Sequence, residues 1–214
     1  MARATFVKAA RKDYPDHGIK KGESYYWWAF RFGGKHRSKE PPKPSQLTHS
    51  EYLSQLYALQ EQVGELNLAP TTVGDLESLK SDVEVIMGDM ESLRDETDEK
   101  RGNVEDAFPG GSPVLETLEV RVEACENNIS LLDDASSELE SLIREVEARQ
   151  ERLAKRRKKQ DEKKDPKVEA PKDEDEEEEE EDDGDEDLGE DELTQDEQSR
   201  AEDIVGSIEI EEGE

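Results

Sequence analysis

Cationic and aromatic side chains are interleaved in a short stretch near the start of the chain. Residues 1–44 contain eight of the eleven aromatic residues, together with eleven Lys and Arg but only four Asp and Glu. Aromatic rings stack on nucleobases and Lys or Arg neutralises phosphates, so this combination is typical of surfaces that bind nucleic acid. The side chains that would perform this chemistry are Lys20, Lys21, Tyr25, Trp27, Arg31, Lys35, Arg37 and Lys39.

A purely structural interpretation of the same residues is that the aromatics form a small core and the cations keep it in solution. In a strand, alternate side chains point to opposite faces. This places Tyr25, Trp27 and Arg31 on one face and Phe30 and Phe32 on the other. Both faces cannot be buried in so small a module. We expect the Phe30 and Phe32 face to pack on the helix that follows, leaving the first face exposed to a partner.

The residue types needed for catalysis do not occur in a recognisable pattern. The three histidines, His17, His36 and His49, lack the spacing of a metal site. Cys125 is the single cysteine, so no intrachain disulfide is possible, and it occupies a core position of a heptad repeat. Nothing places two carboxylates in a pocket, as a general acid–base pair requires. We therefore expect no catalytic site, no metal site and no cofactor.

A small β sheet should position the cationic and aromatic residues. Residues 24–32 are strongly β-forming, Gly33-Gly34 supplies a two-residue turn, and residues 35–39 can return as the second strand. A further strand is predicted near residues 5–9. Prolines at 41, 42 and 44 end the sheet, and a helix should follow over residues 45–68, with Ser45 or Thr48 as its N-cap.

Two heptad repeats predict a coiled-coil hairpin. The first runs through Leu76, Leu79, Val83, Ile86, Met90, Leu93 and Thr97, and the second through Leu115, Leu118, Val122, Cys125, Ile129, Leu132, Ser136, Leu139, Ile143, Val146, Gln150 and Leu153. Residues 107–113, rich in Pro and Gly, form the turn of an antiparallel hairpin over residues 72–160. Either the helix over 45–68 or a second chain would then cover the hairpin, and the repeat does not choose between them.

Charge is segregated along the rest of the chain. Residues 155–164 are basic and should prolong the helix past its apolar seam, whereas residues 173–214 contain twenty-five Asp and Glu and a single Arg. We expect disorder over residues 161–214, because self-repulsion keeps such sequences extended. An apolar patch over residues 204–210 could dock on a partner protein. The acidic region could also compete with nucleic acid for the N-terminal residues, whose net charge is +7.

Composition indicates an elongated helical protein rather than a compact one. Charged residues make up 41% and hydrophobic residues 31% of the 214 residues, and the net charge is −30. Such a chain cannot bury a large core. There is no signal-peptide pattern and no apolar stretch of membrane-spanning length. The expected organisation is a basic aromatic β head (1–44), a linking helix (45–68), a coiled-coil hairpin (72–160) and an acidic tail (161–214), in a protein of the cytoplasm.

One stretch has a recognisable likeness. The block over residues 20–39, KKGESYYWWAFRFGGKHRSK, resembles the N-terminal block of uncharacterised proteins encoded by tailed bacteriophages, a resemblance that extends over residues 1–66. It implies the cytoplasm of a bacterial host. The block is also similar to the arm-type DNA-binding module of phage integrases, through Arg31, Gly34, Lys35 and Ser38. No recombinase catalytic domain follows, so that similarity implies DNA contact but not recombination.

Two functions fit these observations. In the first, a non-catalytic accessory protein binds nucleic acid through its head, forms oligomers or spaces its ends through the coiled coil, and is regulated by its tail. In the second, a scaffolding or virion-associated assembly protein binds only protein partners, and its basic head contacts an acidic protein surface. Binding to arbitrary DNA with steep salt dependence would favour the first.

Overall fold

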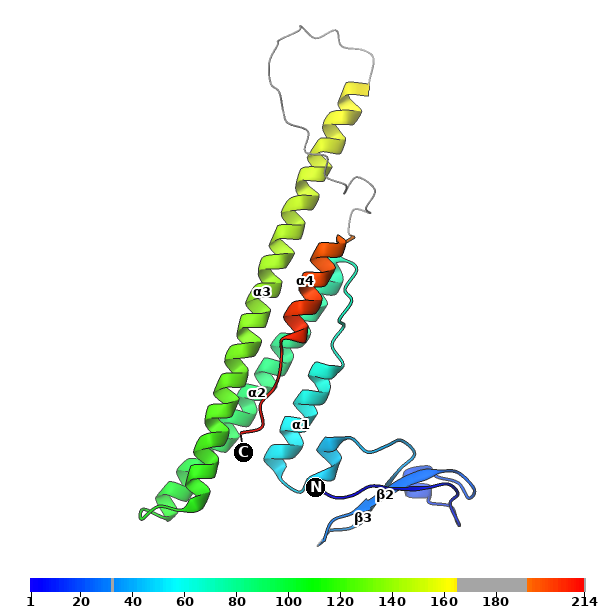
Figure 1. Ribbon diagram of the computed structural model, residues 1–214, viewed down its shortest axis with the longest axis vertical. Coiled ribbons are helices and arrows are strands. Elements are labelled where there is room, and N and C mark those ends of the chain that lie inside the picture. Colours follow the sequence, from blue (N-terminus) through cyan, green and yellow to red (C-terminus); the bar gives the residue numbers. More distant parts are fainter. Residues whose placement is uncertain (32, 165–191, 214) are drawn as a thin grey trace. The chain divides into compact units, whose positions relative to one another are not determined.

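The computed structural model describes residues 1–31, 33–164 and 192–213, with side chains in the long helix described as far as residue 159. It confirms a mainly helical chain with a small antiparallel sheet near the start (Figure 1). Contacts divide the chain into two units. The first comprises Met1–Glu65, Val85–Leu131 and Glu209–Glu214, and the second comprises Leu66–Glu84 and Leu132–Ile208.

The head is a three-stranded antiparallel sheet in the order β1-β2-β3. Its strands are β1 (Thr5–Val7), β2 (Tyr25–Ala29) and β3 (Lys35–Ser38), so each predicted strand is present but shorter than expected. Between β1 and β2 a single 3₁₀ turn, Pro15–His17, ends at Gly18, whose φ of 64° suits a residue without a side chain. The sheet confirms the β head predicted from the sequence.

The linking helix α1 (Glu51–Gly64) begins later than the sequence suggested. Its N-cap is Ser50, which accepts a hydrogen bond from the Leu53 amide, so the prediction of Ser45 or Thr48 was wrong. A separate 3₁₀ turn, Pro44–Leu47, precedes it, and Thr48 is extended. Ser45 instead donates from its hydroxyl to the Glu61 carboxylate at 2.9 Å, which ties the turn to α1. Ser45 therefore makes a tertiary contact with α1 and does not cap it.

Helices α2 (Val73–Ala107) and α3 (Pro113–Lys164) form the predicted hairpin on either side of the short Pro/Gly turn. In the second unit Lys80 pairs with Glu140 and Ser136 donates to Glu84, so position rises along α2 as it falls along α3. This order makes the pair antiparallel, as expected (Figure 1). The first heptad series is buried throughout, at Leu76, Leu79, Val83, Ile86, Met90, Leu93 and Thr97.

Helix α3 buries a wider face than a two-stranded coiled coil requires. Ala124, Asn128, Ala135 and Leu142 lie beside its heptad seam and are buried as well. In the first unit α1 covers this face, since the Tyr52 hydroxyl lies 3.8 Å from Cys125 Sγ and the Arg121 guanidinium lies over the Tyr52 ring. The sequence left open whether the linking helix or a second chain covers the hairpin; in the first unit the linking helix does so.

In the second unit the additional covering helix is α4 (Gln195–Gly206), and the expected disorder over residues 161–214 was wrong for this segment. Residues 165–191 of that expected tail lie outside the described residues. A complete capping box between Thr194 and Glu197 starts α4, and Ala201 and Val205 are buried. The helix was missed because the high density of acidic residues around it favoured a prediction of disorder over its amphipathic spacing. The apolar patch predicted to dock on a partner instead contributes Val205 and Ile208 to the chain's own buried residues.

Candidate nucleic-acid interface

The register of the sheet assigns each candidate side chain to a face. Trp27 pairs with Thr5 on one side and with Arg37 on the other, so these three residues share a face. The Ala29–Lys35 pair lies on the same face, because it is two residues further along both strands. The sheet therefore brings Trp27, Lys35 and Arg37 together, as a binding surface would require.

The Tyr25 and Trp27 face is not left open as predicted. Tyr25 is only 8% exposed and forms a small core with Ala10 and Ile19, against which Tyr14 and Trp27 pack. Residues 8–23 fold back over this face. Main-chain hydrogen bonds hold them there, from Ala10 to the Glu23 carbonyl and from Gly22 to the Ala10 carbonyl. No element was predicted from the sequence for residues 10–23, and in the structure this segment supplies the covering layer.

Cations surround the rim of this small core. The Arg37 guanidinium lies 4.3 Å from the centre of the Tyr14 ring, and Lys12 Nζ lies 5.5 Å from the same ring. Lys35 Nζ lies 5.7 Å from the centre of the Trp27 ring. Lys12 and Lys35 are exposed and Arg37 is half-buried. Cation–π contacts hold the charges in place while their outer sides face water, where a phosphate could reach them.

The opposite face presents the more accessible aromatic rings. Phe6 is 51% exposed and its ring lies 5.1 Å from that of Tyr26, to which it is paired across the sheet. The exposed His36 ring stacks on buried Trp28 at 5.5 Å. The face expected to be covered thus offers Phe6, Tyr26 and His36 for stacking. This group was missed from the sequence because it depends on the pairing of β1 with β2, which the pattern of a single strand does not reveal.

The covering expected over Phe30 and Phe32 is only partly visible. The Phe30 ring centre lies 4.0 Å from that of His49, just before α1, while Phe32 lies outside the described residues. A Cβ at Gly33 would lie 3.2 Å from Phe30 Cβ, so the turn also approaches this ring closely. The half-buried Phe30 therefore links the sheet to the segment that enters α1.

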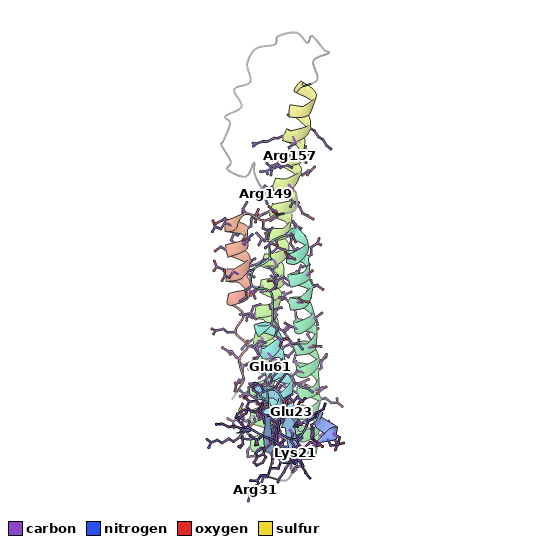
Figure 2. All side chains as sticks on the ribbon, turned by 90° about the vertical axis from the view of Figure 1, so that its right-hand side faces the viewer. Lys21, Glu23, Arg31, Glu61, Arg149 and Arg157 are labelled. Atoms are coloured by element: carbon purple, nitrogen blue, oxygen red, sulfur yellow. The ribbon has the colours of Figure 1, made fainter. Side chains whose placement is uncertain are left out.

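The remaining predicted residues lie around the turns of the head (Figure 2). Lys21 and Lys20 are exposed, and their main-chain amides donate to Asp13 and Glu23. Lys39 Nζ lies 3.1 Å from Glu23 Oε2. The Lys20 amide, and then Lys39, lower the pKa of Glu23. Arg31 is exposed in the turn after β2 and already has an interaction partner.

The second basic region lies along the last turns of α3, where the sequence predicted a prolonged helix. Lys155 Nζ pairs with Glu151 at 2.7 Å, one turn earlier on the same helix. Arg156 and Arg157 are exposed and have partners as well. Arg157 projects from the helix surface in Figure 2. Cations in this position complement the C-terminal end of the helix dipole.

Outside the head, the buried Cys125 thiol and Tyr52 hydroxyl lie in contact with each other. Burial raises the pKa of the Cys125 thiol, and burial followed by the neighbouring thiol raises the pKa of the Tyr52 phenol. Both groups are therefore held in their neutral forms. Among the described residues, no three His, Cys, Asp or Glu side chains gather as metal ligands would. The helices of the described ranges include none long and apolar enough to cross a membrane.

The chain was also compared with known proteins. No family model, no curated protein and no solved structure matches it. Its function is therefore inferred from the geometry of the head and the charge distribution of the chain.

Proposed function

We propose that this chain is a non-catalytic accessory protein, of the kind encoded by tailed bacteriophages, whose head binds nucleic acid. The observation that supports this proposal is the placement of Lys35 and Arg37 on one face of a three-stranded sheet whose other face presents exposed Phe6 beside half-buried Tyr26. Phosphates would contact the cations and unpaired bases would stack on the rings. The helical hairpin would space or join copies, and the acidic region would regulate access to the head.

The test uses the full chain and its intrinsic fluorescence, because both tryptophans, Trp27 and Trp28, lie in β2. Single- and double-stranded oligonucleotides are titrated across a salt series. Quenching that weakens steeply with salt is the expected result. No change in fluorescence at low salt would overturn the proposal, provided that circular dichroism shows a folded chain.

A pair of charge-matched variants localises the binding. The double variant Lys35→Gln/Arg37→Gln should weaken binding and lower the salt slope by about 2, since each lost phosphate contact removes about one unit. The control, Lys80→Gln/Lys100→Gln, removes the same charge from α2. An equal loss of affinity in both variants would mean that net charge alone, and not the head, accounts for the binding.

The alternative is an assembly protein that binds only protein partners. The observation favouring it is that the cations Lys35 and Arg37 already contact aromatic rings of the head, as in a surface that is stable without nucleic acid. Under this alternative the chain forms a defined oligomer and ignores oligonucleotides. Light scattering after size-exclusion chromatography, with and without oligonucleotide, distinguishes the two.

A further inference from the structure

The segment of residues 209–213, in the first unit, is an extended stretch after α4 (Figure 1). Side chains of α1 and α3 bind it. Gln60 Nε2 donates to the Ile210 carbonyl at 3.0 Å. Asn128 makes two bonds to Glu211, donating from Nδ2 to its carbonyl at 3.0 Å and accepting from its amide at 2.9 Å. These three hydrogen bonds reach the main chain of the segment, so they recognise an extended peptide rather than one side chain.

Asn128 is the strongest sign that this contact is built into the fold. It is 1% exposed, it lies within a long helix, and its side-chain amide has both its donor and its acceptor paired with Glu211. A buried amide without partners is costly, because its donor and acceptor lose the hydrogen bonds that water would make with them. An apolar residue would serve helix packing better at this position, so a buried Asn makes physical sense only when a peptide main chain lies opposite it.

Two further contacts read the sequence of the segment. Gly213 has φ of +61°, and a Cβ there would lie 2.7 Å from Ala124 Cβ and 3.2 Å from the Val120 carbonyl oxygen. A side chain at this position would therefore clash with α3. The Tyr57 hydroxyl donates to the Glu212 carboxylate at 3.2 Å. The surface thus selects an acidic residue followed by glycine.

The Tyr52 hydroxyl lies 3.4 Å from the Glu212 carbonyl oxygen, to which it can donate. We propose that this surface, formed by Tyr52, Tyr57, Gln60, Ala124 and Asn128, is a peptide-docking site for an extended acidic peptide of the type Ile-Glu-Glu-Gly. The 209–213 segment is its resident ligand in the same chain. The corresponding segment of a second copy fills the site when the resident segment is displaced. Because the resident segment is tethered, its effective concentration at the site is high. The segment of a second copy therefore replaces it to a significant extent only when binding of the resident segment is weakened.

The test adds a fluorescent synthetic peptide of residues 207–213 to the full chain carrying Gly213→Val. This substitution should keep the resident segment from seating, so the site becomes available. We expect the peptide to bind this variant at least about tenfold more tightly than the unchanged chain, in which the tethered segment competes. A peptide that itself carries Gly213→Val should not bind, which controls for attraction by charge alone.

A second substitution identifies the site. Asn128→Leu, combined with Gly213→Val, should abolish peptide binding because both main-chain hydrogen bonds are lost. Asn128→Asp, which keeps the acceptor and loses the donor, serves if the leucine variant does not fold. The proposal is overturned if the peptide does not bind a folded Gly213→Val chain. It is also overturned if the peptide binds the unchanged chain, or the Asn128 variants, as tightly as it binds the Gly213→Val chain. None of these outcomes depends on nucleic-acid binding by the head.

Discussion

At the residue scale, a few half-buried polar side chains determine which segment packs on the long helices. Arg149 donates from Nε and an Nη to the two carboxylate oxygens of Glu197, each at 3.0 Å, and from an Nη to the Glu192 carbonyl (Figure 2). The side chains of Arg149 and Glu197 are only 18% and 12% exposed. A two-pronged guanidinium–carboxylate pair of this kind is directional and resists screening by salt. It fixes the start of α4 against α3.

Replacing this arginine should release α4. Arg149→Ala leaves the Glu197 carboxylate half-buried without its cation, and we expect a loss of about 1–3 kcal/mol in the stability of α4. Hydrogen–deuterium exchange of residues 195–206 measures the effect as faster exchange. The control is Arg152→Ala, which removes an exposed arginine one turn further along α3. Unchanged exchange in Arg149→Ala would show that packing alone holds α4.

The buried phenol of Tyr52 should make stability depend on alkaline pH. An unfolded tyrosine loses its proton near pH 10, whereas burial raises the pKa of Tyr52 in the folded chain. Above pH 10 the unfolded state therefore binds fewer protons than the folded state, and stability falls as pH rises. Tyr52→Phe should cost about 1 kcal/mol at pH 7 and remove part of this slope. Urea unfolding at several pH values between 8 and 11 compares the two chains; parallel curves would contradict the prediction.

At the element scale, the helices differ in what makes them stable. α2 and α3 are long heptad helices; the seam of α2 is buried throughout, and that of α3 is buried at most of its positions. α4 has only twelve residues, a length at which an isolated helix is marginal in water. Its capping box contributes about 1 kcal/mol, which does not suffice without packing. The contacts of Ala201 and Val205 within the second unit must therefore provide the remainder.

Introducing a charge into this contact should unfold α4 without affecting the hairpin. Ala201 is fully buried, so Ala201→Glu would place a carboxylate in a buried site at a high cost in free energy. We expect α4 to detach from the rest of the second unit rather than bury this charge. Exchange of residues 195–206 should become fast, while most of the helical circular dichroism remains. Ser199→Glu adds the same charge at an exposed position of the same helix and should leave exchange unchanged. Protection that survives in Ala201→Glu would rule out packing as the source of stability.

At the scale of the whole molecule, the segregation of charge is the dominant feature. A net charge of −30 contains a head of +7 and a run over residues 173–187 in which every residue except Gly184 is acidic. Charges of opposite sign on one chain attract each other over a Debye length of about 10 Å at 0.1 M salt. Under the proposed function, we expect the acidic run to compete with anionic ligands for the head.

Neutralising the acidic run should strengthen binding to nucleic acid. A full chain in which the Asp and Glu of residues 173–187 are replaced by Asn and Gln should bind an oligonucleotide more tightly at low salt, because a competitor is removed. The difference should shrink as salt is added. Trp fluorescence titration of both chains across a salt series measures it. Equal affinity at every salt concentration would show that the acidic run does not act on the head.

Some features were determined by the sequence itself. The helical hairpin follows from the heptad spacing, which fixes a buried seam whatever lies around it, and the turn follows from Pro and Gly, which cannot continue a helix. The first two strands follow from β-branched and aromatic residues, and the third follows from the Gly33-Gly34 turn, which returns the chain alongside β2. Alternation along β2 also separates Tyr25 and Trp27 from Tyr26 and Trp28, because it is a property of the strand alone.

Other features were decided only by the tertiary structure, because they depend on segments far apart in the chain. Residues 8–23 cover the Tyr25 face of the sheet, a choice that alternation cannot make. The acidic sequence around α4 is polar enough to predict disorder, and the helix forms because α3 supplies Arg149 and the second unit buries Ala201. Asn128 in α3 has a clear role only when Glu211, 83 positions away, is placed opposite its amide. Local pattern fixes the elements, and long-range packing fixes which of their faces remain available for binding.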